Sequence, residues 1–153
     1  MIIQSKNKEE MANLIKECFA TDKALIENWH VASPASSEEC AERTIADMKY
    51  ADPSLQLFAA YENSELAGYW GVEHGYYINL IFVKPQYRNK EFMREFWKEI
   101  TKDMPNLFCT AIYSKNKPAA AFYSKLGKKT EDFTHEGNQV SRYIFEKEAN
   151  VCR

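Results

Sequence analysis

The chain has 153 residues, the length of one ordinary domain, and 45% of them are hydrophobic, so it can bury a core of its own. Its net charge of −2 argues against a general nucleic-acid coat or a protein that binds anionic membranes. With only five glycines, a glycine-rich nucleotide-binding fold is not expected either. We therefore expect a single domain over residues 1–153 that binds neither nucleic acid nor membrane.

The cysteines add a second set of exclusions. Cys18, Cys40, Cys109 and Cys152 form no CxxC pair, and no histidine lies at metal-ligand spacing from any of them, so no metal site is expected. The start of the chain has no signal-peptide pattern, and no apolar run approaches the length of a membrane span. These features predict a cytoplasmic protein whose reduced cysteines are small core residues rather than nucleophiles.

The first third of the chain predicts one edge strand and two helices. The elements are a strand at 1–4, a helix over 7–20 and a helix over 37–50. Apolar residues at every third or fourth position mark one face of the first helix. Ser36 and Glu39 have the spacing of a capping box, which predicts the start of the second. Trp29 and His30 lie between the two helices in a less regular stretch.

The middle third predicts three strands with short links, which is typical of an antiparallel meander. The strands cover 55–62, 66–74 and 76–83. Pro85 closes the third strand, and a helix over 89–102 leads to a further strand at 107–113. Because strand, helix and strand in this order form a crossover, we expect the strands at 76–83 and 107–113 to be parallel. A crevice beyond the carboxyl ends of such strands is the usual place for a ligand.

The last third predicts a short helix followed by a hairpin. Asn116 caps the helix, Pro118 lies in its first turn, and Gly127 is expected to end it in the left-handed conformation. Two strands, 129–134 and 139–146, complete the chain. The full order is β-α-α-β-β-β-α-β-α-β-β. It predicts an α+β fold with a mixed, mostly antiparallel central sheet and helices on both faces.

The stretch VKPQYRNKEFMREFW, residues 83–97, runs from a buried strand into a helix whose start carries positive charge. Amides at a helix N-terminus are unpaired, and the helix dipole favours an anion there. Glycines would let a phosphate approach this backbone closely, but the chain has Glu91 and Met93 instead. Two interpretations of Glu91 stay open: it stabilises the helix dipole in place of a phosphate, or it turns outward and leaves the amides to one. Met93 is expected to pack in the core.

Two motifs and the order of elements resemble the GNAT superfamily of acyl-CoA-dependent N-acyltransferases. The first motif is V-x-P-x-x-R at 83–88, which the family continues with two glycines that this chain replaces. The second, NKPAAAFYSKLG at 116–127, is the more specific. The resemblance covers nearly the whole chain in element order. It implies transfer of an acetyl group from acetyl-CoA, or of the acyl group of another acyl-CoA, to a primary amine of a small molecule or peptide by direct attack.

The resemblance also implies where the cofactor binds. The pantetheine arm would pair with the end of the strand before Pro85 and with Asn116, and the diphosphate would lie on the turn that opens the next helix. The implied cofactor-binding residues are Ile81, Phe82, Val83, Arg88, Asn89, Lys90, Glu91, Phe92, Met93, Asn116, Ala120 and Tyr123. Since dimers through the late strands are common in the family, a homodimer would be in keeping with it.

The candidate catalytic residues are Tyr123 and Asn79, by the resemblance, and Glu73, by its nearness to Asn79 in the predicted strands. Tyr123 matches the family's tyrosine that faces the thioester sulfur, where a phenol with a pKa of ~10 can protonate the leaving thiolate; otherwise it is a packing residue. Asn79 stands where many family members have a carboxylate base, so it can orient the amine or a water but cannot take a proton. Glu73 is the nearest alternative base, and the further candidates are His74, Tyr76 and Tyr77.

The departures from the motifs keep a second function open, that of a catalytically inactive GNAT-like protein with a structural or partner-binding role, of phage or mobile-element type. In that case an exposed aromatic surface would bind the partner. Its residues would be Tyr69, Trp70, Tyr76 and Tyr77. By the resemblance, Trp29 and His30 would lie in a loop over the acceptor pocket, or Trp29 would belong to the core. Modification of nucleobases is disfavoured because the chain has no basic stripe.

Overall fold

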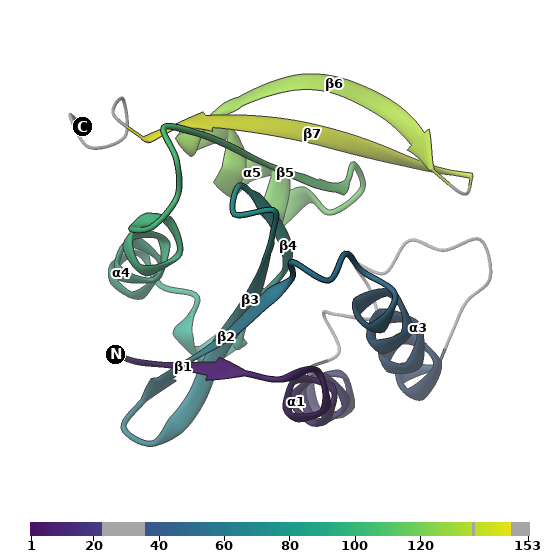
Figure 1. The fold of residues 1–153 in the computed structure, drawn as a ribbon, viewed down its shortest axis with the longest axis vertical. Helices are drawn as coiled ribbons and strands as arrows, with labels where there is room; N and C mark the ends of the chain where they lie inside the picture. Colours follow the sequence, from purple (N-terminus) through teal and green to yellow (C-terminus); the bar gives the residue numbers. More distant parts are fainter. Residues whose placement is uncertain (23–35, 136, 148–153) are drawn as a thin grey trace.

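A seven-stranded sheet organises the computed structural model, which describes residues 1–22, 36–135 and 137–147 (Figure 1). The strands are β1 (Ile2–Lys6), β2 (Gln56–Glu62), β3 (Glu65–Glu73), β4 (Tyr77–Val83), β5 (Leu107–Tyr113), β6 (Lys128–His135) and β7 (Asn138–Glu146). The helices are α1 (Lys8–Thr21), α3 (Ser37–Lys49), α4 (Lys90–Thr101) and α5 (Lys117–Leu126), with a 3-10 turn η1 (Pro85–Tyr87) before α4. The predicted order and types of elements are confirmed.

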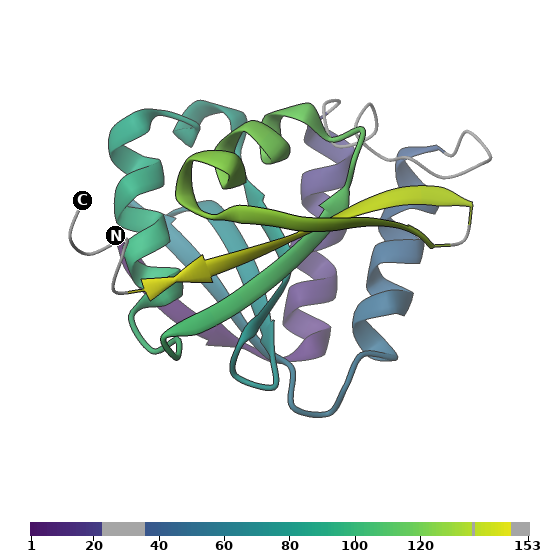
Figure 2. The same ribbon diagram turned by 90° about the horizontal axis from the view of Figure 1, so that it is seen from above.

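Helices cover both faces of the sheet, with α4 and α5 on one face and α1 and α3 on the other (Figures 1 and 2). The core under α4 and α5 is aromatic: the ring of Trp97 lies 6.1 Å from that of Tyr123 and 5.1 Å from that of Phe145. The core under α1 and α3 is largely aliphatic, and Met11 and Ile15 in it are fully buried. Burial of each such side chain contributes roughly 1.5–3 kcal/mol to the free energy of unfolding.

Strand pairing confirms the antiparallel meander and the parallel crossover. The order across the sheet is β1-β2-β3-β4-β5-β7-β6, and only β4 and β5 run parallel among the described strands. The parallel pairing is short. It consists of Tyr77 opposite Cys109 and Ile78 opposite Thr110, whereas β5 and β7 pair from Leu107 to Tyr113. Beyond Ile78 the two parallel strands part.

The expectation that Gly127 ends α5 in the left-handed conformation is wrong. Gly127 has a φ of −151°, which is extended backbone, because α5 passes directly into β6 at this residue. A Cβ atom here would lie 2.5 Å from the carbonyl oxygen of Ile144 and closer still to the ring of Phe145. The glycine is therefore explained by close packing against β7 rather than by its freedom in φ.

The expected aromatic partner surface is also wrong. Tyr69 is 2% exposed and Trp70 is 3% exposed, because β3 is covered by helices on both faces and its alternate side chains enter the two cores. Tyr77 is half-buried, and Tyr76 remains exposed. The near-continuous apolar run of β3 is the pattern of a strand buried on both sides. Trp29 and His30 lie outside the described residues.

Candidate active site

A β-bulge in β4 bends this strand at the point where it leaves β5. The register between β3 and β4 shifts between Trp70, opposite Ile81, and Gly71, opposite Asn79, so Leu80 is the extra residue. Leu80 has a φ of +61°. A leucine in this left-handed region costs roughly 1–2 kcal/mol, which the pairing on both sides of it must offset. The bulge increases the local bend and twist of β4.

The two strands are joined once more by a side chain before they part. Thr110 Oγ1 donates a 2.8 Å hydrogen bond to the carbonyl oxygen of Ile78, and Thr110 is 2% exposed. From Asn79 onward, β4 has a strand partner only on its β3 side within the described ranges. A length of β4 backbone therefore faces the gap with hydrogen-bonding groups that a ligand with amides of its own can use.

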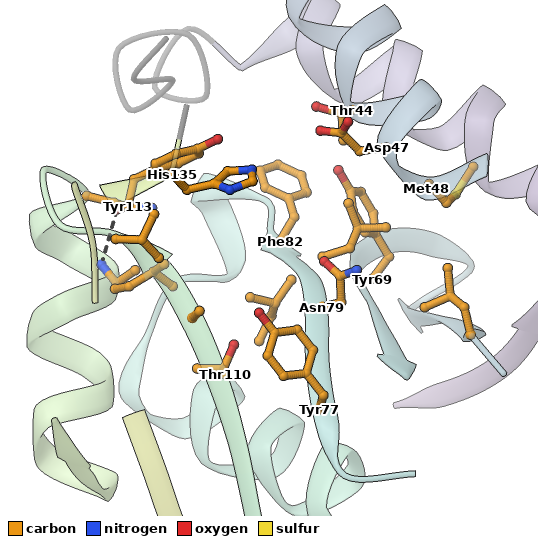
Figure 3. A pocket seen from close by; sticks show the side chains of 18 of the residues that line it. Thr44, Asp47, Met48, Tyr69, Tyr77, Asn79, Phe82, Thr110, Tyr113 and His135 are labelled. Atoms are coloured by element: carbon orange, nitrogen blue, oxygen red, sulfur yellow. Dashed lines mark hydrogen bonds between the residues drawn. The ribbon is translucent and has the colours of Figure 1, made fainter. Parts of the chain in front are cut away.

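A cavity of about 510 Å³ fills this gap and extends to α3 (Figure 3). Its walls include residues 79–82 of β4 and 110–113 of β5. Thr44, Asp47 and Met48 of α3 close another side. This volume lies in the range of ordinary small-molecule sites. The cavity lies toward the carboxyl ends of the two parallel strands, the region where a ligand crevice was expected.

Asn79 and Glu73, two of the three candidate catalytic residues, contact each other. Asn79 lines the cavity, and Glu73 lies behind the cavity wall. The Nδ2 of Asn79 donates a hydrogen bond to Oε1 of Glu73. Because an ionised carboxylate can only accept, the amide nitrogen of Asn79 must face Glu73. Its Oδ1 is then left as an acceptor on the opposite side of the amide. The pair therefore offers an oriented amide oxygen with a carboxylate directly behind it.

The other base candidates lie in two different places. His74 is exposed and has a φ of +55°; its ring faces Asp52 at 3.6 Å and stacks on Tyr76, so neither residue lies on the cavity wall. Tyr77 does line the cavity. Burial raises the pKa of the Tyr77 phenol, and the nearby Cys109 and Glu73 raise it further. Tyr77 is thus a protonated hydroxyl in the cavity at neutral pH rather than a base.

Tyr123, the third candidate catalytic residue, lies behind the cavity wall. It is 1% exposed, among the rings of Trp97, Tyr143 and Phe145. Burial raises the pKa of its phenol well above the ordinary value, and a hydrogen bond with Thr110 opposes this only in part. Because Thr110 is itself on the cavity wall, the Tyr123 hydroxyl is one side chain away from the cavity.

Arg88 is bound to protein groups and does not project from the start of α4. Its Nη2 lies 2.8 Å from Oδ2 of Asp22, a residue 7% exposed at the end of α1, and its Nε donates to the carbonyl of Val83 at 2.7 Å. The guanidinium also lies 5.5 Å from the centre of the Phe82 ring. Arg88 thus ties the end of α1 to the turn between β4 and α4.

The start of α4 presents unpaired amides. Asn89 caps the helix: its Oδ1 accepts from the amide of Phe92 at 2.8 Å, and its carbonyl accepts from the amide of Met93 at 3.0 Å. The amides of Asn89, Lys90 and Glu91 have no hydrogen-bond partner among the described residues. The Lys90 and Glu91 side chains are exposed, and Met93 packs against the core as expected. Three adjacent donors at a helix N-terminus are the kind of backbone groups that can bind an anion.

The second motif opens the helix on the other side of the gap. Asn116 is the expected N-cap of α5, and its side chain accepts from the amide of Ala119 at 3.3 Å. Both residues line the cavity, whereas the amide of Ala120 is bound to the carbonyl of Asn116 within the helix. Of the implied cofactor-binding residues, Ile81, Phe82 and Asn116 lie on the cavity wall.

Several polar residues of the cavity were missed at the level of the sequence. They are Thr44, Asp47, Tyr69, Thr110, Tyr113 and His135. Figure 3 shows Thr44 and Asp47 beside Tyr69 on one side of the cavity, and Tyr113 and His135 on the other. They come from α3, β3, β5 and β6, which no local motif connects. A sequence signal could not have united them, because only the folded sheet brings these elements together.

In the described part of the chain, no group of three or more His, Cys, Asp or Glu side chains could hold a metal ion. Within the same ranges, the helices are too short or too polar to cross a membrane.

Comparison with known proteins identifies the family. The sequence model of the Acetyltransferase (GNAT) family matches residues 9–128. No curated protein sequence matches the chain. Similar solved structures include an acetyltransferase from Thermus thermophilus, with a TM-score of 0.70, 15% identity, and coverage of 95% of this chain and 97% of that chain.

A second similar structure is a variant of the spermidine N-acetyltransferase SpeG from Vibrio cholerae, with a TM-score of 0.60 and 13% identity over 99% of this chain and 98% of that chain. A third is a GNAT-family protein from Desulfovibrio desulfuricans, with a TM-score of 0.66 and 15% identity over 95% of this chain and 98% of that chain. At these identities the structures show a common fold. Together with the family match over well more than half of the sequence, they show that this chain belongs to the GNAT acetyltransferase family.

Proposed function

We propose that this chain moves an acetyl group from acetyl-CoA to a primary amine by direct attack of the amine on the thioester. The observation that carries the proposal is the gap between β4 and β5, which is open beyond two residue pairs and leads to the start of α4. A pantetheine arm has amides that match the free edge of β4, and a diphosphate matches the free amides of the α4 turn. Membership of the family supports the same assignment.

The anion site is assigned to the backbone amides of Asn89, Lys90 and Glu91, with the Lys90 side chain adding positive charge. Arg88 contributes by holding the turn in place through Asp22 and Val83. Glu91 is exposed, so its carboxylate can turn into solvent while its amide faces the anion. Its negative charge still weakens the site, because like charges at one helix N-terminus repel.

In this proposal Asn79 and Glu73 handle the amine. Asn79 Oδ1 accepts a hydrogen bond from the attacking nitrogen and so directs its lone pair toward the thioester carbon. The C–N bond forms as the C–S bond breaks, and the electron pair of the broken bond stays on sulfur. Glu73 takes the proton from nitrogen through a water that the Asn79 amide holds. The Asn79 position thus retains a role although an amide cannot be a base.

The developing thiolate is stabilised from the side of Thr110. Burial keeps Tyr123 protonated, so its hydroxyl stays a neutral group beside Thr110 rather than one that gives up its proton. Thr110 in turn can direct its hydroxyl hydrogen from Ile78 to sulfur. A hydrogen bond aimed at charge that develops only in the transition state lowers the barrier. The thiolate then takes its proton from solvent.

Calorimetric titration with acetyl-CoA tests the proposal, with acetyl-pantetheine, which lacks the diphosphate, as the comparison ligand. Acetyl-CoA is expected to bind more tightly, because only it reaches the amides of the α4 turn. Glu91→Gln should tighten acetyl-CoA binding by removing the competing charge, and Glu95→Gln, an exposed position on the same helix, is the matched control. Absence of binding at about 1 mM acetyl-CoA, an affinity weaker than about −4 kcal/mol, would refute the proposal.

The partner-binding alternative has lost its main support. It required an exposed aromatic surface, and both Tyr69 and Trp70 are buried.

A further inference from the structure

The described residues of the cavity wall carry very little fixed charge, and what they carry is negative. Among the described lining residues, Asp47 is the single carboxylate and His135 is the single basic side chain, with no lysine or arginine. The positive side chains of this region, Lys84, Arg88 and Lys90, belong to the turn between β4 and α4 and are not on the cavity wall. Over the described residues, the structure thus separates a cationic end, suited to an anionic cofactor, from a cavity wall without lysine or arginine.

Apart from Thr44, Asn79, Thr110 and Asn116, whose polar groups are uncharged, the rest of the described wall is apolar or aromatic. The rings on it are those of Phe19, Tyr69, Tyr77, Phe82, Tyr113 and Phe133. Aliphatic side chains, among them Met48 and Leu55, fill the space between α3 and the sheet. Such walls favour flat or apolar ligand bodies, and the faces of the rings attract cations.

Asp47 lies where an incoming amine would meet it. Figure 3 shows Asp47 and Thr44 pointing from α3 toward the side of the cavity that contains Tyr69, with Asn79 below them on β4. Asp47 is exposed to solvent, so it can attract an ammonium group before the group loses its water. A carboxylate or phosphate on the same path would meet the Asp47 charge and would find no lysine or arginine on the described wall to replace its hydration.

We propose that the acceptor is a primary amine with an apolar or aromatic body and without a carboxylate or phosphate group, drawn in by Asp47. This deepens the proposed function and rests on it. It excludes free amino acids and phosphorylated amines as the preferred acceptors, and it favours arylalkyl and alkyl amines. The distinction follows from the charges on the wall and does not depend on the identity of the general base.

Matched pairs of amines that differ only in a carboxylate test the inference. Tyramine is compared with tyrosine, and phenethylamine with phenylalanine, at fixed acetyl-CoA, with thiol release as the readout. The two amines are expected to have kcat/KM values at least about tenfold above those of the two amino acids. The reason is that the carboxylate of an amino acid would lose its hydration in the cavity without gaining a partner. The affinity of each amine and each amino acid is also measured by calorimetry, with and without CoA. The compounds can then be ranked by affinity even where turnover is slow.

Variants at Asp47 show whether this residue sets the preference. Asp47→Asn should bring the kcat/KM for tyramine closer to that for tyrosine. Asp47→Lys should bring the two values closer still, because the lysine provides a cation for the carboxylate of tyrosine. Glu42→Gln removes the same charge from α3 at an exposed position that does not line the cavity, and should leave the ratio of the two values unchanged.

Equal use or equal binding of the amines and the acids, with acetyl-CoA bound normally, would overturn the inference and leave the proposed function in place. The inference also fails if the Asp47 variants change the ratio no more than Glu42→Gln does. Failure of acetyl-CoA to bind would instead count against the proposed function. A preference for the amines that both Asp47 variants reduce supports the inference.

Discussion

The Thr110 hydroxyl donates its hydrogen bond to the Ile78 carbonyl at the last residue pair that β4 and β5 share. One residue later β4 reaches Asn79 and then the bulge at Leu80, and the strands separate. Thr110 therefore marks the inner end of the gap, where it contacts both the backbone of β4 and the hydroxyl of Tyr123. The buried Thr110 side chain therefore has a structural role, at the point where β4 and β5 part, and a role in the proposed stabilisation of the thiolate.

Replacement of Thr110 by valine tests the structural part of this role. Thr110→Val keeps the shape but removes the hydroxyl, and should lower the free energy of unfolding by about 1–3 kcal/mol because buried polar groups lose their partner. Urea denaturation measures the change. Thr101→Val is the control, since Thr101 donates to the carbonyl of Trp97 within α4 and a local bond of this kind contributes little. Equal effects of the two substitutions would contradict the role of Thr110.

Removal of the Tyr123 hydroxyl tests the chemical part. Tyr123→Phe should lower kcat by about tenfold, the effect of one hydrogen bond lost in the transition state, and leave acetyl-CoA affinity within about twofold. Steady-state kinetics and calorimetry measure the two quantities. Tyr143→Phe is matched to it, because it removes a second hydroxyl from a ring 5.8 Å away in the same core. Unchanged turnover in Tyr123→Phe, or an equal loss in both variants, would remove Tyr123 from the mechanism.

Stability should decline in alkaline solution because two buried tyrosines resist ionisation. Burial raises the pKa of Tyr69 and of Tyr123 above the ordinary value. Each buried tyrosine has a higher pKa in the folded state than in the unfolded state. Its contribution to the free energy of unfolding is therefore complete below the unfolded-state pKa of about 10, and it is lost as the pH rises further. The free energy of unfolding, measured by urea denaturation from pH 8 to 11, should therefore fall above pH ~10.

Phenylalanine variants test whether the buried tyrosines cause this decline in stability at high pH. Tyr69→Phe and Tyr123→Phe should each flatten the decline, because the variant has no phenol left to ionise in the unfolded state. Tyr50→Phe should leave it unchanged, since Tyr50 is 91% exposed. A decline of the same slope in all four proteins would show that these buried phenols are not its cause.

Arg88 should matter more for stability than for binding. Arg88→Ala breaks the pair with Asp22 and should lower the free energy of unfolding by about 1–2 kcal/mol, a value moderated by solvent because the Arg88 side chain is 39% exposed. Lys90→Ala should instead leave stability within about 0.5 kcal/mol and weaken acetyl-CoA binding. Denaturation and calorimetry on both variants separate the two roles. Should Arg88→Ala abolish binding at unchanged stability, Arg88 is a ligand to the phosphate after all.

Local patterns predicted what local forces decide. The caps at Ser36 and Asn116 accept hydrogen bonds from the amides three residues later, as their positions in the sequence imply. The order of helices and strands along the chain followed from the alternation of apolar runs and breaks. The resemblance then directed attention to the end of the strand before Pro85, which is where β4 leaves β5 in the structure.

Features set by contacts between distant segments could not be predicted in this way. Leucine has no preference for the left-handed region, so nothing in the sequence marks the bulge at Leu80; it arises because β4 must satisfy β3 on one side while it leaves β5 on the other. Asp47 lines the cavity from α3, and two complete strands, β2 and β3, lie between α3 and Asn79 in the sequence. Gly127 gave a misleading signal, since close packing and left-handed backbone both select glycine.

The short contact between β4 and β5 has a mechanical consequence. Strands β1 to β4 and strands β5 to β7 form two well-paired blocks, joined in the sheet through the pairs at Tyr77 and Ile78. This seam is the part of the ladder where the two blocks can separate with the fewest broken backbone bonds. A molecule whose amides bridge the open length would act as a temporary strand and extend the seam. Occupation of the gap should therefore make the two blocks unfold together.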